Sequence, residues 1–150
     1  MSLNPFDINN TLLAKHAQHV VLIHFPIALL ITAAAFDFIS QWTKRHGLAE
    51  AAYFNFLAAA ISTLPTLATG FLAWRFALEG QKVKGILLEH IVLAWTSSLL
   101  IWLIWAIHFR ARRRPQMPPT YRLWIELAAV AIIALAGHLG GFLSGVNGPG

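Results

Sequence analysis

The sequence contains no cysteine, and only 11% of its 150 residues are charged. Without cysteine the chain cannot form disulfides, Cys-ligated zinc sites, iron–sulfur clusters or a covalently attached c-type haem. Soluble domains carry roughly 25% charged residues, so this shortage of charge is typical of a membrane protein. The sequence also lacks a phosphate-binding loop, a dinucleotide fingerprint, a base near Ser97 and Ser98 that would suit a hydrolase, and any internal repeat that we can detect.

Hydrophobic residues make up 57% of the chain and gather in four long runs. A transmembrane helix needs about 20 mainly apolar residues. The stretches that meet this requirement cover residues 20–42, 52–76, 86–109 and 123–143, with short polar connections between them. The first is expected to stay in the protein as a helix, because its apolar run continues past the small residues 33–35 that resemble a signal-cleavage site. We therefore predict an all-α fold, an integral membrane four-helix up-down bundle that forms a single domain over residues 1–150.

Basic residues are distributed unevenly between the two sides of the predicted bundle. Of the 11 lysines and arginines, most fall in residues 44–45 and 110–122, on the side of the first and third connections. Because cytoplasmic loops carry the excess of Lys and Arg, we expect these connections inside and both termini in the periplasm of a bacterial inner membrane. The basic run 110–114 adjoins a span, so we interpret it as a topology signal that rests on anionic lipid. We expect no nucleic-acid partner.

Histidines recur at one depth in three of the four predicted spans. His19 and His24 begin the first span, His90 begins the third, and His138 lies near the end of the fourth. All four are therefore expected near the outer surface. Polar residues within spans usually face a cavity, a partner or a cofactor, so we favour a binding site over a hydrogen-bond network that only packs the bundle. His108 is expected instead at the inner interface, beside arginines.

Small residues accompany the histidines in the second and fourth spans. They recur every four positions on one helix face, as Ser62, Thr66 and Gly70, and as Gly137, Gly141 and Gly145. Alone, each stripe is typical of close helix packing. Neutral imidazole, however, is a ligand for haem iron, copper and zinc. Beside the histidines, Gly70, Gly137 and Gly141 are candidate contacts of a porphyrin edge, and haem b, in one or two copies, is the cofactor we predict.

The spacing of His19 and His24 restricts how the histidines pair. Five residues apart on a helix, they point about 140° away from each other, so they are not expected to bind the same atom. Pro26 is expected to loosen the helix one turn earlier. Two separate sites follow, with two arrangements of similar merit. Either His24 pairs with His90 and His19 with His138, or His24 pairs with His138 and His19 with His90.

Three carboxylates lie within or beside the predicted spans. Asp37, in the inner part of the first span, is expected to pair with a nearby arginine or a loop amide rather than to relay protons. Glu126, four residues after Arg122, is expected to form an ion pair along its helix. Glu89, next to His90, is placed to orient an imidazole.

Several strings of the sequence resemble one known family. The strings HVVLIHFPIALL, LATGFLAW, EHIVLAW and GHLGGFLSG are similar to a bacterial four-helix membrane family catalogued as a domain of unknown function, with His-Phe-Pro-Ile and His-Leu-Gly-Gly signatures. The resemblance covers about residues 16–148 and implies a four-span inner-membrane protein whose signature histidines match His19, His24, His90 and His138. Members often carry proline directly after the first of these, where this chain has Val20. The family has no assigned activity, so the resemblance implies topology and ligands rather than a mechanism.

One functional prediction and two alternatives follow. We predict a membrane-embedded, b-type cytochrome-like protein that transfers electrons between a periplasmic carrier and quinone or a larger membrane complex, with histidine on both sides of the haem iron. The first alternative is a copper or zinc site built from three or four of the same histidines, which would handle or sense metal. The second is a non-catalytic structural subunit of a respiratory or photosynthetic complex. The chain is compatible with a homodimer as well as with a subunit role.

Overall fold

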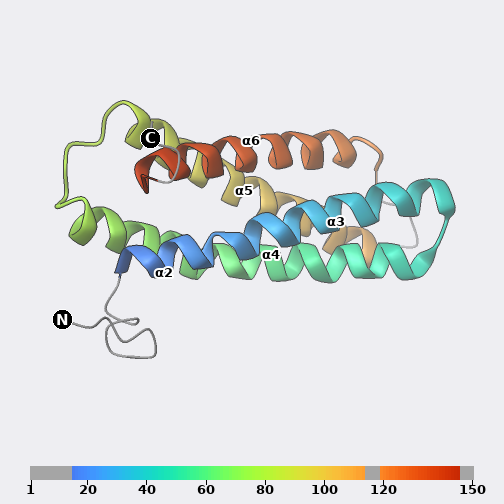
Figure 1. The fold of residues 1–150 in the computed structure, drawn as a ribbon. Coiled ribbons are helices and arrows are strands. Elements are labelled where there is room, and N and C mark those ends of the chain that lie inside the picture. The colour runs from blue at the N-terminus through green and yellow to red at the C-terminus, as the bar shows by residue number, and fades with distance from the viewer. Residues whose placement is uncertain (1–14, 114–118, 146–150) are drawn as a thin grey trace.

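The structure, a computed structural model, describes residues 15–113 and 119–145, and all regular secondary structure within these ranges is helical (Figure 1). The helices are α2 (Lys15–Leu22), α3 (His24–Thr43), α4 (His46–Leu72), the π-helical turn η1 (Ala73–Ala77), α5 (Ile86–Arg112) and α6 (Arg122–Leu143). Four stretches are long and apolar enough to cross a membrane: Gln18–Thr43, His46–Phe76, Ile86–Arg112 and Arg122–Leu143. The predicted all-α four-helix membrane bundle is confirmed. Arg114, in the basic run, lies outside the described residues.

The helices extend beyond the predicted hydrophobic runs, most of all α4, which begins at His46 rather than at residue 52. The connection before it is very short because Lys44 adopts a left-handed conformation, with φ of 56°, and ends α3 abruptly. Its N–H donates to the carbonyl oxygen of Ser40 at 2.8 Å and so satisfies one of the last carbonyls of the helix. The polar residues that follow therefore form the first turns of α4 instead of a loop.

A break separates α2 from α3 at Ile23. Its cause is Pro26, which has no N–H and whose ring excludes the carbonyl group four residues earlier. That carbonyl, of Leu22, instead lies 3.3 Å from the Thr66 hydroxyl of α4, whose single proton it shares with the nearer carbonyl oxygen of Ser62 at 2.8 Å. The two histidines of the first span consequently lie on two different helices.

The four spanning helices form a ring in the order α3, α4, α5, α6. Helix α3 packs along α4 and α5 along α6, while contacts between α4 and α5 and between α3 and α6 close the ring. Helices α3 and α5 therefore lie diagonally opposite and run in the same direction (Figure 1). We call the end that holds α2, the start of α5 and the end of α6 the histidine end. The end that holds the α3–α4 turn and the start of α6 is the arginine end.

The core midway between the two ends is apolar and closely packed. It consists of Leu30, Ala33, Ala52, Phe56, Ala59, Ala60, Ile101, Ile104, Ala129 and Ile133. Half of these residues are alanine. In a membrane the hydrophobic effect does not drive helices together, and small residues instead let the helices approach closely and pack. Large apolar side chains such as Leu64, Leu99 and Leu127 point outward, as expected for helices surrounded by lipid.

The buried positions repeat along the chain at a constant spacing. Pro26, Leu30, Ala33 and Asp37 of α3 correspond to the buried residues Ser97, Ile101, Ile104 and His108 of α5. At a spacing one residue shorter, Ala52, Phe56, Ala59 and Thr63 of α4 correspond to Arg122, Glu126, Ala129 and Ile133 of α6. The bundle is therefore built from two similar helical hairpins, α3–α4 and α5–α6. Because diagonal helices correspond and run in parallel, an approximate two-fold axis runs along the bundle.

This internal repeat corrects the sequence analysis, which found none. Its clearest trace in the sequence is the match between residues 19–22, HVVL, and residues 90–93, HIVL. Elsewhere the two hairpins share the pattern of burial rather than the residues, as where Phe56 corresponds to Glu126. A helix that is apolar on every side does not reveal in its sequence which face is buried.

Candidate functional site

A cavity of about 540 Å³ lies at the histidine end and is lined by residues of every spanning helix. We call it the histidine cavity. Six of the predicted site residues line it, namely His19, His24, Gly70, His90, Gly137 and Gly141. None of its described lining residues is an aspartate, glutamate, lysine or arginine, and most are apolar. Its volume lies within the range of about 300–1,000 Å³ that small-molecule and cofactor sites occupy.

His90, in the first turns of α5, is fixed against the neighbouring helix α6. Its Nδ1 lies 2.9 Å from the carbonyl oxygen of Ala136, and since a carbonyl can only accept, Nδ1 carries the proton and donates. The ring lies over Gly140, where an added Cβ would meet the imidazole Cε1 at 3.1 Å. Any side chain at residue 140 would therefore push the ring from its position.

His19, on α2, is held in the same manner by α4. A Cβ on Gly70 would meet the imidazole Cε1 at 3.0 Å. The ring Nδ1 lies 3.3 Å from Thr69 Oγ1. The hydroxyl of Thr69 is itself directed to the carbonyl oxygens of Pro65 and Thr66, at 2.8 and 3.0 Å. The Thr69 oxygen therefore accepts from the imidazole Nδ1–H, because its own proton is already donated.

His19 and His90 occupy equivalent positions in the two hairpins, and so do Gly70 and Gly140. Helix α2 continues the line of α3, which is diagonally opposite α5 (Figure 1). The two imidazoles consequently enter the histidine cavity from opposite sides of the two-fold axis. Each ring packs against the second helix of its own hairpin, His19 against α4 and His90 against α6.

The hydrogen bonds indicate the same tautomer for all three histidines of the cavity. The Nδ1 of His24 lies 2.7 Å from the carbonyl oxygen of Val20, so it too carries the proton. A neutral imidazole has one ring proton, and Nε2 of each ring therefore bears the lone pair. Histidines that bind metals commonly show this arrangement, with Nδ1–H held by an oxygen and Nε2 directed at the metal.

His24 and His138 differ from the symmetric pair. The side chain of His24 is exposed at the margin of the cavity, and its counterpart in the second hairpin is Trp95. His138 is not among the described lining residues; its exposed ring packs edge to face on Phe142, with 5.0 Å between ring centroids. Both pairings predicted from the sequence use His138, which the structure places outside the cavity.

The cavity histidines do not form a compact metal centre. In residues 15–113 and 119–145, the one set of three or more His, Asp or Glu whose ligand atoms lie within 4.8 Å of one another is Asp37, His108 and Glu126. This set lies at the arginine end, about 20 Å along α3 from the histidines. Among the described residues, no three of the four histidines considered for a copper or zinc site bring their ring nitrogens within 4.8 Å of one another.

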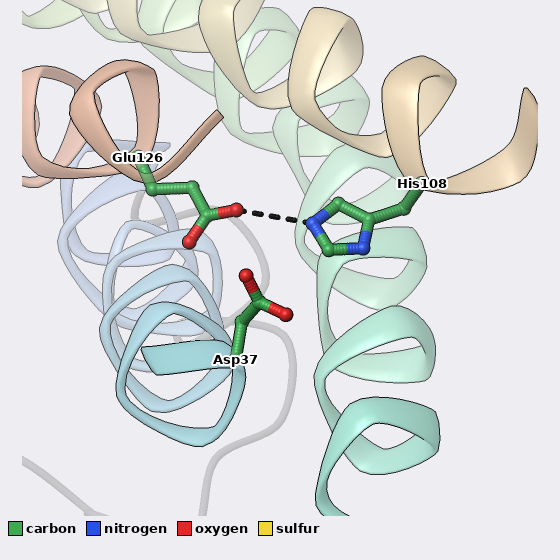
Figure 2. A group of neighbouring side chains, drawn as sticks. All are labelled: Asp37, His108 and Glu126. Atoms are coloured by element: carbon green, nitrogen blue, oxygen red, sulfur yellow. Dashed lines mark hydrogen bonds and ion pairs between the residues drawn. The ribbon is translucent and has the colours of Figure 1, made fainter. Parts of the chain in front are cut away.

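Four ionisable side chains meet inside the arginine end. Asp37 of α3, His108 of α5, and Arg122 and Glu126 of α6 are each at most 5% exposed. Figure 2 shows Asp37, His108 and Glu126 pointing toward one another from three helices. We call these four residues the buried ionic cluster. Since positions 37 and 108 are equivalent in the two hairpins, the cluster lies near the two-fold axis.

Arg122 holds both carboxylate oxygens of Asp37. Its Nε donates to Oδ2 at 2.8 Å and its Nη2 to Oδ1 at 3.1 Å, while Nη1 donates to the carbonyl oxygen of Pro119. Arg122 is thus the arginine that the sequence analysis expected beside Asp37. The expected helix ion pair of Arg122 with Glu126 is longer, at 3.9 Å. The short contact of Glu126 is with His108, at 3.0 Å between Oε1 and Nε2.

His108 is buried, which corrects the expectation that it lies at the inner interface. Its ring packs against Phe56 of α4, with 4.8 Å between ring centroids. The reason is its position on α5, which faces the two-fold axis as Asp37 does on α3. The arginine that follows one turn later does reach the surface, where the guanidinium of Arg112 lies 4.4 Å from the ring centroid of Tyr53.

Comparison with known proteins assigns the chain to a family. A family model described as a predicted membrane protein (DUF2231) matches residues 15–148. The chain belongs to the DUF2231 family. No curated protein and no solved structure gives a match. The resemblance to an uncharacterised membrane family is therefore confirmed, and the match includes both hairpins.

The DUF2231 chain also contains site residues that the sequence analysis did not select. Gly140 and Thr69 position the two symmetric imidazoles, whereas a Cβ on Gly137 would make only an ordinary contact, 3.5 Å from Ile27 Cδ1. The glycines that recur every four residues, Gly137 and Gly141, lie near Gly140 in the sequence but do not include it. Only the equivalence of positions 70 and 140 in the two hairpins would have identified Gly140. Glu89, which the sequence analysis considered as a residue that orients an imidazole, is exposed in the first turn of α5.

Proposed function

We propose that this DUF2231 protein is a b-type cytochrome-like electron-transfer protein that binds one haem in the histidine cavity, between His19 and His90. One observation carries the proposal. The two hairpins contribute the same residue from the same position, on opposite sides of one cavity and with the same indicated tautomer. A haem held by two histidines would match the approximate symmetry of such a site.

The cavity suits a haem in size and polarity. Its volume of about 540 Å³ and its apolar lining fit a flat, mainly apolar macrocycle. Gly70 and Gly140 let the imidazoles of His19 and His90 lie close against α4 and α6. Lys82 and Lys84, exposed in the connection before α5 at the same end, would offer positive charge to the carboxylates of the porphyrin.

Each residue of the proposed site has a distinct part. His19 and His90 would bind the iron through Nε2, while Thr69 and the backbone carbonyl of Ala136 would hold the rings through Nδ1. A bound haem supplies reversible one-electron chemistry. Because two histidines would hold the iron, the site would favour electron transfer over oxygen chemistry.

The geometry supports a haem better than a bare copper or zinc ion. Metal–imidazole bonds of about 2.0–2.1 Å require several ligand nitrogens to lie within about 4 Å of one another. No three histidines of the described chain approach one another so closely. A haem needs only two histidines, one on each face, because the porphyrin supplies the other four ligands.

The proposed electron partners are a periplasmic carrier and quinone, or a larger membrane complex that contains this chain. The uneven distribution of basic residues favours an arginine end in the cytoplasm of a bacterium and a histidine end at the periplasmic face of the inner membrane. A haem at that end would lie within reach of a soluble carrier.

The test is a reduced-minus-oxidised visible spectrum of the full chain, purified in mild detergent from cells supplied with haem. We expect a sharp α band, a strong Soret band and one haem per chain. Replacement of His19 or His90 by alanine should abolish or shift these bands. His24→Ala and His138→Ala should retain them, and His46→Ala, at the arginine end, is the matched control.

Three results would contradict parts of the proposal in distinguishable ways. A flat spectrum from haem-supplied cells would overturn it and favour a structural subunit. Stoichiometric copper or zinc without a chromophore would favour the metal alternative. Haem bands that survive in His19→Ala and His90→Ala but disappear in His24→Ala would keep the haem and refute the ligand pair.

A further inference from the structure

The charges of the buried ionic cluster do not balance without an additional proton. Arg122 is always protonated and neutralises Asp37, which it contacts at two points. Glu126 remains, and its short contact is with His108. With a neutral His108 and an ionised Glu126 the cluster would carry one net negative charge. One proton, on either residue, makes it neutral.

The surroundings of this pair offer no further compensating charge within the described residues. The groups that face His108 and Glu126 are Asp37 from α3, Phe56 from α4 and Arg122 from α6. Farther out, Glu50 of α4 and Arg112 of α5 lie 3.8 Å apart, and both are exposed. A net charge buried inside a membrane protein is costly, so the neutral state of the cluster is favoured.

We propose that His108 and Glu126 form a buried proton-binding site that holds one proton at about neutral pH. The 3.0 Å separation of Nε2 and Oε1 keeps a hydrogen bond whether the proton lies on the imidazole or on the carboxyl group. Asp37 is not part of the site, because the guanidinium of Arg122, which contacts both of its oxygens, already balances its charge. This inference does not depend on the proposed haem.

Protons would reach the site from the arginine end. Toward the histidine end the cluster meets the apolar core, where Ala33, Leu30 and Ile104 are fully buried within two turns of Asp37 and His108. On its other side Arg122 contacts the backbone of Pro119, which is exposed. The core therefore separates the proton-binding site from the histidine cavity.

A proton fits this cluster better than a divalent metal ion does. Asp37, His108 and Glu126 are close enough to share a cation. However, the guanidinium of Arg122 already lies on Asp37. A divalent ion added to two carboxylates and one guanidinium would leave one net positive charge buried, whereas a proton leaves none.

The test determines the protonation of both groups by NMR of the full chain in detergent or lipid at about pH 7, with ¹⁵N-labelled histidine and ¹³C-labelled glutamate. We expect one proton for the pair, as an imidazolium with an ionised carboxylate or as a neutral ring with a protonated carboxyl group. The signals are assigned by their loss in His108→Gln and Glu126→Gln. If a variant does not fold, contacts with the Phe56 ring identify the His108 signals in the unmodified chain.

The Glu126→Gln variant and a control variant test the proposed proton-binding site further. In Glu126→Gln the remaining charges already balance, so His108 should be neutral. Glu50→Gln, which removes an exposed carboxylate at the same end, should leave the signals of the pair unchanged. A neutral His108 beside an ionised Glu126 in the unmodified chain would overturn the proposal. Stoichiometric binding of zinc or manganese that disappears in Glu126→Gln would also overturn it, in favour of a metal site.

Discussion

Asp37 of α3 and Arg122 of α6 lie 85 residues apart in the chain and meet in a two-point contact inside the arginine end, at 2.8 and 3.1 Å. Asp37 belongs to the first hairpin and Arg122 to the second, so the contact joins the two halves of the bundle. The cost of removing two charges from water can offset their attraction, so the presence of this ion pair does not by itself show that the pair stabilises the protein. Removal of one partner, in contrast, has a large predicted effect.

Arg122→Met should destabilise the protein by about 3–5 kcal/mol, because it leaves the buried carboxylate of Asp37 without its partner. The measurement is thermal unfolding in detergent. The double variant Asp37→Leu/Arg122→Met should recover most of the loss, since it removes both charges. Glu50→Gln, which removes the exposed partner of Arg112, should change stability by about 1 kcal/mol or less. An Arg122→Met variant as stable as the unmodified chain would refute the buried pair.

Gly140→Ala should weaken haem binding by about 10–100-fold, because the added methyl group would displace the ring of His90. Gly47→Ala, at the arginine end, is the control, since its methyl group would meet no atom within 4 Å and lies outside the histidine cavity. Titration of the haem-free protein, followed at the Soret band, measures the effect. Equal affinities of the two variants would show that the fit of the ring on Gly140 is unimportant.

Thr69→Val should weaken haem binding about tenfold, because His19 would lose the oxygen that accepts its Nδ1–H. Thr69→Ser keeps that oxygen and should bind haem as the unmodified chain does. The same Soret titration compares the two variants. If valine and serine behaved alike, the hydrogen bond would have no part in orienting the imidazole.

Thr66→Val should destabilise the protein by about 1 kcal/mol or less, because the carbonyl of Leu22, released by Pro26, would lose the hydroxyl proton that it shares with the carbonyl of Ser62. Thr96→Val is the control, since the Thr96 hydroxyl binds only a carbonyl of its own helix among the bonds described. Thermal unfolding of both variants in detergent is the measurement. Equal stabilities would mean that water or another group satisfies the Leu22 carbonyl.

The number and the alternating direction of the spanning helices could be predicted from the sequence, because runs of about 20 apolar residues are typical of transmembrane helices and short connections join them. Direction and helical rise were also sufficient to place His19 and His90 at one depth. The break after α2 followed from Pro26, whose effect on the preceding turn is local. These features depend on the chain itself or on the membrane rather than on contacts between distant residues.

The inward faces of the helices could not be predicted, because the lipid-facing and core-facing sides are both apolar. The burial of His108 and the place of Gly140 beneath His90 depend on how each helix is rotated about its axis. In soluble proteins a polar outer face reveals that rotation, whereas the outer faces of these helices are apolar. The repeat was hidden for the same reason, since the hairpins share buried positions while Ala52 is replaced by Arg122 and Phe56 by Glu126.

The approximate two-fold axis has different consequences at the two ends of the bundle. At the histidine end, His19 and Gly70 of one hairpin correspond to the identical His90 and Gly140 of the other, an arrangement that would suit the proposed haem, whose two faces are alike. At the arginine end the equivalent positions of the two hairpins hold different residues: Asp37 corresponds to His108, and Phe56 corresponds to Glu126. A dimer of two identical hairpins would crowd two copies of every ionisable group around the axis, and like charges would meet there. The covalently joined pair of hairpins holds one copy of each, so a single chain can keep equivalent histidines at one end while its ionisable groups at the other end are complementary in charge.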